Sequence, residues 1–507
     1  HYGSEKLNTT STGIDVTGII VSDGMSTNTS GTSNFIAGVN AGNSITSGGN
    51  YNTVVGDEAG TAITTGDNNV AIGYAALDAE DTGRHSTAIG ANALSAQNND
   101  ASNYNVAVGS NAGAAVTTGT NNTFIGGLAG DANTTADNNT AVGSSALTTS
   151  TTGSENTAVG TNALAANTTA SNNVALGVNA LQLNTTGANN TSVGRSALEA
   201  NTTASNNTAV GQGAAAANTT GTLNTAIGYS ALDANTTASN NTAVGGNALT
   251  ANTTGANNNA LGQSAMAANT TGNDNVGIGR QALDANTTGG ANVAMGSDAL
   301  GANTTASNNT AIGYQSLITN TTGTQNVAIG ASTLDTNTTG GQNTAMGYAA
   351  MDNNTTGTQN TAVGGLALDA NTTANNNTAV GYAALTTNTT GATLVAIGQN
   401  ALAANTTANN NVAVGAEALE ANTTGADNVA MGKAALADNT TGNYNTGVGT
   451  LAILDNTTGS SNTALGYFAL TNNTTASANT AVGKNALLLN TTGSSNVAVG
   501  VTTLDAN

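Results

Sequence analysis

Three aspartates occupy the same place in three successive repeats of the chain: Asp335, Asp352 and Asp369. If these repeats stack as neighbouring strands, their carboxylates lie about 5 Å apart. Carboxylates that close either spread into water or collect a hard cation such as Ca²⁺. The calcium-binding repeat GGxGxDxUx is absent from the chain. The sequence therefore favours a solvated acidic edge and leaves a stacked Ca²⁺ site as the alternative.

Catalytic groups are scarce. The two histidines, His1 and His85, share no repeated spacing with a serine or an aspartate. A Ser–His–Asp set needs three side chains held in one geometry. The paired glycines lack the strand–turn–helix context of a dinucleotide-binding fingerprint and are typical of turns. We therefore expect no enzyme activity, and no cofactor apart from the possible Ca²⁺.

Two other residue types recur in a regular way. Asn-Thr-Thr is formally an N-glycosylation acceptor, although a polar turn is the favoured interpretation. Tyrosine often follows a glycine, where its ring either stacks on a sugar or a partner chain or merely covers an edge. Examples are Asn167, Asn184, Asn201 and Asn218 for the first, and Tyr74, Tyr229, Tyr314, Tyr348, Tyr382 and Tyr467 for the second.

All these residues belong to one repeated unit, of which NTAVGGNALTANTTGAN at residues 241–257 is an example. Its glycine recurs every 17 residues from Gly109 to Gly500. Earlier glycines continue the pattern with steps of 17 to 19 residues, at Gly90, Gly73, Gly56 and Gly38. A period kept this strictly predicts that each repeat is one structural step stacked on its neighbours.

Each unit contains two candidate strands. The first candidate strand is the three residues before the glycine: Thr or Val, then a small residue, then an aliphatic residue. The second candidate strand follows the glycine and carries Leu and Ala on one face. Turn signals lie too close together for a stable helix, and the fixed aliphatic position argues against disorder. We predict an all-β parallel β-solenoid of about 27–28 coils with a 17-residue repeat and a thin core of Val/Ile and Leu columns. Stacking at about 4.8 Å predicts a rod on the order of 130 Å long.

An asparagine precedes the first strand in most repeats, as at Asn122, Asn139, Asn156 and Asn173. Stacked asparagine amides form hydrogen-bonded ladders in some parallel stacks. Asparagine is equally suited to turn geometry. The sequence leaves both interpretations open.

Residues 1–33 do not follow the repeat. One or two short strands, broken by Gly18, are expected around Ile14–Val16 and Ile19–Val21. We interpret residues 1–33 as an irregular N-terminal cap or joining segment and residues 34–507 as the repeat shaft. The longer step between Gly90 and Gly109 predicts a bulging loop within it.

Composition excludes several classes of protein. Charged residues make up 7% of the chain, the net charge is −21, and the six cationic residues are scattered. No basic patch exists for a nucleic acid, and no apolar run is long enough for membrane insertion. The chain has no Cys, no Pro and no Trp, so a core of small and β-branched residues is expected. The absence of Cys fits an extracellular location.

The unit NTAVGxxALxANTTGxxN resembles the repeats in the heads of trimeric autotransporter adhesins. It is closer still to repeats of tail-fibre-like proteins of marine phages and related bacterial surface proteins. The opening GSEKLNTTSTGIDVTGIIVSDG, residues 3–24, also resembles segments of such tail fibres, and together the resemblance covers essentially the whole chain. It implies a left-handed parallel β-roll and an extended attachment or structural fibre.

We therefore predict a non-enzymatic structural subunit of an extended extracellular fibre or filament, such as a phage tail fibre or a cell-surface appendage shaft. The column of Ala side chains is a candidate surface for close packing, so we expect a homotrimer or a filament. Residues 1–33 of one subunit could cover the last coil of the next and give head-to-tail polymers. The alternative is an adhesin, on a cell surface or a virion, whose lateral face binds host-surface glycans or proteins.

Overall fold

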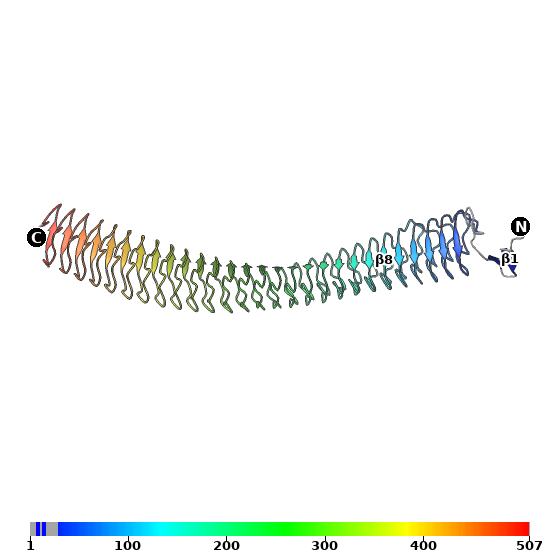
Figure 1. Cartoon of the computed structure of the whole chain (residues 1–507), viewed down its shortest axis with the longest axis horizontal. Coiled ribbons are helices and arrows are strands. Elements are labelled where there is room, and N and C mark those ends of the chain that lie inside the picture. Colours follow the sequence, from blue (N-terminus) through cyan, green and yellow to red (C-terminus); the bar gives the residue numbers. More distant parts are fainter. Residues whose placement is uncertain (1–6, 11–12, 17–28, 506–507) are drawn as a thin grey trace, which may run out of the picture. The chain divides into compact units, whose positions relative to one another are not determined.

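The computed structural model describes residues 7–10, 13–16 and 29–505, and these form an all-β structure without helices. The chain divides into two compact units, residues 1–189 and 190–507. In each unit, short strands stack in parallel, one coil upon the next (Figure 1). The prediction of a parallel β-solenoid with a 17-residue repeat is confirmed.

The first unit contains a hairpin and a stack of nine strands. In the hairpin, β1 (Leu7–Thr10) pairs with β2 (Gly13–Val16) in antiparallel fashion. The expected strand at Ile14–Val16 lies within β2, whereas Ile19–Val21 lies outside the described residues. The stacked strands are β3 (Phe35–Ala37), β4 (Thr53–Val55), β5 (Val70–Ile72), β6 (Thr87–Ile89), β7 (Val106–Val108), β8 (Thr123–Ile125), β9 (Thr140–Val142), β10 (Thr157–Val159) and β11 (Val174–Leu176).

The second unit contains nineteen stacked strands, and each is three residues long. They are β12 (Thr191–Val193), β13 (Thr208–Val210), β14 (Thr225–Ile227), β15 (Thr242–Val244), β16 (Asn259–Leu261), β17 (Val276–Ile278), β18 (Val293–Met295), β19 (Thr310–Ile312), β20 (Val327–Ile329), β21 (Thr344–Met346), β22 (Thr361–Val363), β23 (Thr378–Val380), β24 (Val395–Ile397), β25 (Val412–Val414), β26 (Val429–Met431), β27 (Thr446–Val448), β28 (Thr463–Leu465), β29 (Thr480–Val482) and β30 (Val497–Val499).

Equivalent residues of successive coils are direct partners in the sheet. Thr225 is paired with Thr242, and Ala226 with Ala243, across the β14–β15 pair. The longer step before Gly109 leaves this register intact, because β6 still pairs with β7 residue for residue. The extra residues of that coil lie outside the strands, as the predicted loop requires.

The prediction of two strands in each coil is wrong. The segment after the glycine is a series of turns, and its Leu has a left-handed backbone, with φ of 51° at Leu249. That conformation is unfavourable for a residue with a Cβ. The turn is held because the Leu249 N–H donates to the Ala265 carbonyl of the next coil at 3.0 Å, while the side chain is fully buried. Burial and hydrogen bonding together offset the backbone cost.

The predicted Val/Ile core column is also wrong. The middle residue of each strand points inward, so Ala226 and Ala243 are fully buried. The aliphatic residue before the glycine points outward, and Ile227 and Leu261 are 39% and 50% exposed. Because strand side chains alternate between faces, burying the Ala column puts both of its neighbours on the outer surface. The core therefore consists of Ala, Leu and Asn columns.

The repeated glycine is required by two constraints. Gly245 has φ of +134°, a region that is essentially restricted to glycine. A Cβ at this position would lie 2.4 Å from the carbonyl oxygen of Gly262 in the next coil. The glycine column thus permits both the sharp corner after the strand and the close approach of successive coils.

Candidate functional site

The three aspartates that the sequence left open as an alternative Ca²⁺ stack are part-buried and lie in successive coils. Burial raises the pKa of all three carboxyls, and the negative charge of Asp352 raises the pKa of Asp335 and Asp369 further. Across the described ranges, however, no three His, Cys, Asp or Glu side chains converge in a way that suits a metal ion. The geometry gives the Ca²⁺ stack no support, and the column is an acidic strip.

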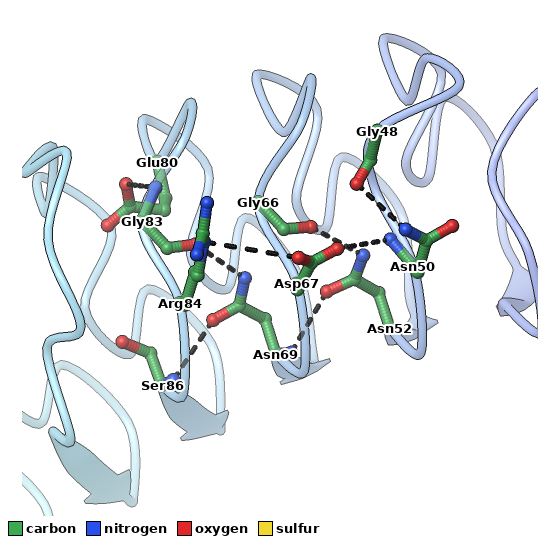
Figure 2. Close-up of polar contacts among 10 residues, drawn as sticks. All are labelled: Gly48, Asn50, Asn52, Gly66, Asp67, Asn69, Glu80, Gly83, Arg84 and Ser86. Atoms are coloured by element: carbon green, nitrogen blue, oxygen red, sulfur yellow. Dashed lines mark hydrogen bonds and ion pairs between the residues drawn. The ribbon is translucent and has the colours of Figure 1, made fainter.

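The asparagines before the strands form a ladder, which we call the strand ladder. In the first unit, the backbone N–H of Asn69 donates to Asn52 Oδ1 at 2.9 Å, and Asn52 Nδ2 donates to the Gly66 carbonyl at 2.8 Å (Figure 2). The same pattern recurs in the second unit, where the N–H of Asn258 donates to Asn241 Oδ1 at 2.9 Å. The predicted ladder is confirmed, but the main donor to each amide oxygen is a backbone N–H.

The asparagines of Asn-Thr-Thr form a second ladder, which we call the turn ladder. Asn252 Nδ2 donates to Asn235 Oδ1 at 3.1 Å and to the Gly255 carbonyl at 2.9 Å, and Asn269 Nδ2 donates to Asn252 Oδ1 at 2.8 Å. These side chains are fully buried. A glycan on Nδ2 is therefore incompatible with the folded coil. The polar-turn interpretation of Asn-Thr-Thr holds, and the sequence did not reveal that its Asn faces the core.

A buried carboxylate occupies the turn-ladder position of one coil in the first unit. Glu80 is fully buried and occupies the position at which later coils carry the ladder asparagine. Its side chain accepts hydrogen bonds from Gln97 Nε2 at 2.7 Å, Asn103 Nδ2 at 3.1 Å and the Gly83 N–H at 2.8 Å. Figure 2 shows Glu80 above the strand ladder. Burial raises the pKa of Glu80, while these hydrogen bonds lower it by less.

Sequence reasoning missed Glu80. The available signal was its place seven residues after Gly73, where the repeat carries the Asn of Asn-Thr-Thr. A charged residue in a core column requires hydrogen-bond partners. The extended coil supplies them, since Gln97 and Asn103 both lie between Gly90 and Gly109.

Within the described residues, the histidine and the tyrosines lie at the surface. His85 stacks on Tyr104 with ring centroids 4.9 Å apart, and His1 lies outside the described residues. The tyrosines that follow a repeat glycine are all exposed, at 45% to 68%. They are Tyr74, Tyr229, Tyr314, Tyr348, Tyr382 and Tyr467. The negative charge of Glu58 raises the pKa of Tyr74.

Comparison with known proteins adds no relative. No family model matches the chain, and no curated protein or solved structure is significantly similar to it. A search of the described residues for helices long and apolar enough to cross a bilayer finds none.

Proposed function

We propose that the chain is a non-enzymatic structural subunit, the shaft of an extended extracellular fibre or filament on a virion or a cell surface. The observation that carries the proposal is the unbroken strand register within each unit, where equivalent residues of successive coils are direct partners. In such a stack each coil contacts mainly its neighbours, so length grows without a central core. The resemblance to fibre and adhesin repeats supports the same role.

The second unit illustrates how such a shaft keeps its form. Its turn ladder runs without interruption from Asn201 to Asn490, and each amide donates to the one before it. The strand ladder lies beside it in the core and is interrupted only where Leu394 replaces an asparagine within residues 190–496. Buried, satisfied amide networks rigidify a core because each unpaired amide is costly. The coil core is therefore stiff despite its small side chains.

Electron microscopy of the purified chain tests the structural role. Elongated particles with a constant width are expected. Compact globular particles would count decisively against a shaft.

Self-association, as a homotrimer or a filament, belongs to the same proposal, but its surface must differ from the one expected from the sequence. The Ala column is buried within the coil and is not free for contact between chains. The exposed alternative is the outer face of the strands, which carries the aliphatic residues before the glycines. In the second unit its nineteen strands offer a strip roughly 86 Å long and about 10 Å wide, on the order of 900 Å². That area is close to the ~800 Å² per partner of a standard interface.

A charge on this outer face tests the self-association. Met346→Glu, in the central strand β21, places a carboxylate in the middle of the strip and is expected to yield monomers in light scattering after size-exclusion chromatography. Thr339→Glu, on an exposed turn of the same unit, is the matched control and should leave the assembly intact. Equal assembly of the two variants would exclude this face.

A second candidate function is an adhesin whose lateral surface binds host glycans or proteins. The observation that favours it is the column of exposed tyrosines after the repeat glycines. Exposed rings present a large apolar surface together with a hydroxyl, which suits sugar and protein ligands. A glycan array probed with the intact chain tests this candidate, and binding at background level would leave only the structural role.

A further inference from the structure

Three exposed tyrosines form a regular row on the second unit. Tyr314, Tyr348 and Tyr382 each follow the repeat glycine, and they are 55%, 68% and 57% exposed. They lie on alternate coils. The coils between them carry Ala331 and Gly365 at the same position. We call these three tyrosines the tyrosine track.

The backbone fixes the spacing of the track. The Ser332 N–H donates to the Tyr314 carbonyl, and the Leu366 N–H donates to the Tyr348 carbonyl, both at 3.0 Å. Each tyrosine is thus held in register with the coil that follows it. Since neighbouring strands lie about 4.8 Å apart, successive tyrosines of the track are separated by about 10 Å.

Small residues, Ala331 and Gly365, occupy the coils between the track tyrosines. A Cβ built on Gly365 would lie 3.6 Å from Tyr382 Cδ2, so the Tyr382 ring extends beside the Gly365 coil. Gly365 has no left-handed backbone constraint. The intervening positions therefore contribute no aromatic ring of their own, and the Tyr382 ring covers part of the Gly365 coil.

Hydrogen-bond acceptors run beside the track. Asp335, Asp352 and Asp369 are part-buried and stand five residues after the repeat glycine. A contact elsewhere in the unit shows what lies next to the fifth residue after the glycine. Asn400, the second residue after Gly398, donates from Nδ2 to Oε1 of Glu420, the fifth residue after Gly415, at 3.4 Å. The fifth position of one coil therefore lies beside the second position of the coil before it.

The second residue after the repeat glycine lies next to the first residue after it, which is the position of the track tyrosines. Tyr467 and Phe468 occupy these two positions in a later coil, and their rings meet edge to face with centroids 4.2 Å apart. The acidic strip therefore runs along the same side of the coils as the tyrosine track.

The spacing and chemistry of this surface match a sugar polymer. In an extended β-1,4-linked glycan, every second sugar ring presents the same face. The length of two sugar units is close to the separation of successive track tyrosines. Carboxylates beside the track accept hydrogen bonds from sugar hydroxyls. The chain has no Lys or Arg between Arg280 and Lys433, so an anionic polymer finds no counter-charge there. We propose that the tyrosine track binds a neutral, extended β-1,4-linked glycan along the stacking direction.

This inference deepens the lateral-binding candidate and does not depend on the structural role. The test uses the full chain, with cellohexaose as the probe and maltohexaose, whose α-1,4 linkages coil the chain, as the control. Tyrosine fluorescence and calorimetry report binding, because the chain has no Trp. Binding of cellohexaose in clear preference to maltohexaose is expected.

Two substitutions compare a track tyrosine with a solitary one. Tyr348→Ala removes the centre of the track and is expected to weaken cellohexaose binding about three- to tenfold, the equivalent of one aromatic stacking contact. Tyr229→Ala is the control, because Tyr229 also follows a repeat glycine and is 59% exposed. The same position two coils before and two coils after it carries Arg195 and Gln263, so Tyr229 has no tyrosine at the spacing of the track. It should leave the affinity unchanged. Tyr348→Phe keeps the ring and should retain most of the binding.

A third variant separates spacing from general aromatic character. Combining Tyr348→Ala with Gly365→Tyr keeps three tyrosines but moves the central one by one coil. The spacing argument predicts that this double variant binds as weakly as Tyr348→Ala, with circular dichroism and melting confirming the fold of both.

Full affinity in the double variant, equal affinity for the two sugars, or no loss in Tyr348→Ala would overturn the proposal. Elongated particles in electron microscopy that fail to bind cellohexaose would reject the glycan site alone. Compact particles would reject the stacked coils themselves, on which both the structural role and the spacing of the track depend.

Discussion

The turn-ladder position is filled differently in the two units. In the second unit it is Asn in every coil from Asn201 to Asn490. In the first unit the same position changes from coil to coil. In order it carries Ile45, Ile63, Glu80, Gln97, Val116, Asn133, Ser150, Asn167 and Asn184. One backbone geometry therefore accepts an apolar column or an amide column.

An abrupt change between the two residue types leaves buried polar atoms without partners. Asn133 follows Val116 and precedes Ser150, and both of its buried side-chain amide atoms lack a hydrogen-bond partner. Asn252, with an asparagine in the coil on each side, has its amide satisfied. A buried amide contributes to stability only when the neighbouring coil supplies its complement. The uniform sequence of the second unit follows from this requirement.

The largest expected effect concerns the glycine column, which both units share. Gly245→Ala should destabilise its coil by at least about 3 kcal/mol, because it combines a strained φ with a clash against Gly262. Native-state hydrogen exchange measures the local loss. Gly246→Ala is the control, since a Cβ there meets nothing within 4 Å. Similar protection in the two variants would show that coils are not packed at this distance.

The next effect breaks the turn ladder of the second unit. Asn252→Val leaves Asn235 Oδ1 and the Gly255 carbonyl without this donor in the core and should cost about 2–3 kcal/mol. Hydrogen exchange should show the loss concentrated in the adjacent coils, as expected for a structure stabilised by nearest neighbours. A loss spread evenly over residues 190–505 would contradict a ladder of local bonds.

The same substitution should have the opposite sign in the first unit. Asn133→Val removes two buried, unpaired amide atoms and restores the residue type of Val116, so a gain of about 1 kcal/mol is expected. Chemical denaturation of the variant and the parent chain measures it. If Asn133→Val were as damaging as Asn252→Val, the contrast between the units would lose its physical basis.

The smallest expected effect is a pH dependence confined to the coils around Glu80. Burial raises the pKa of this carboxyl in the folded chain above its ordinary value, so the folded state binds the proton more tightly. Its contribution is therefore most favourable below the ordinary pKa and is lost as pH rises through the folded pKa, by at most about 1.4 kcal/mol per pH unit. Glu80→Gln should abolish this slope in hydrogen exchange corrected for intrinsic rates. Residues 241–257, which carry no charge, are the internal control.

The sequence predicted the solenoid because its glycine period is strict and reports the stacking directly. It did not predict which face of the strand is buried. Ala243 and Val244 differ little in their suitability for a thin core, and only the position of the turns decides that Ala243 points inward. The Leu segment was misassigned because a left-handed Leu249 contradicts intrinsic preference, and the bond that holds it comes from another coil.

The candidate sites were predictable only in part. The repeat placed the tyrosines in one column and the three aspartates in another. In the structure the tyrosines are exposed at the surface, and the aspartates are half-buried. Glu80 was not singled out, because its partners Gln97 and Asn103 come from an irregular coil that breaks the period. Local departures from a repeat are set by contacts that the repeat itself does not encode.

The most direct measurement is diffraction or cryo-electron microscopy of the purified, aligned chain. Vertically stacked coils predict a strong axial repeat at about 4.8 Å, the separation of neighbouring strands. An elongated particle with that repeat is the expected result. The absence of any axial periodicity near strand separation would contradict the stacking of coils and everything inferred from it.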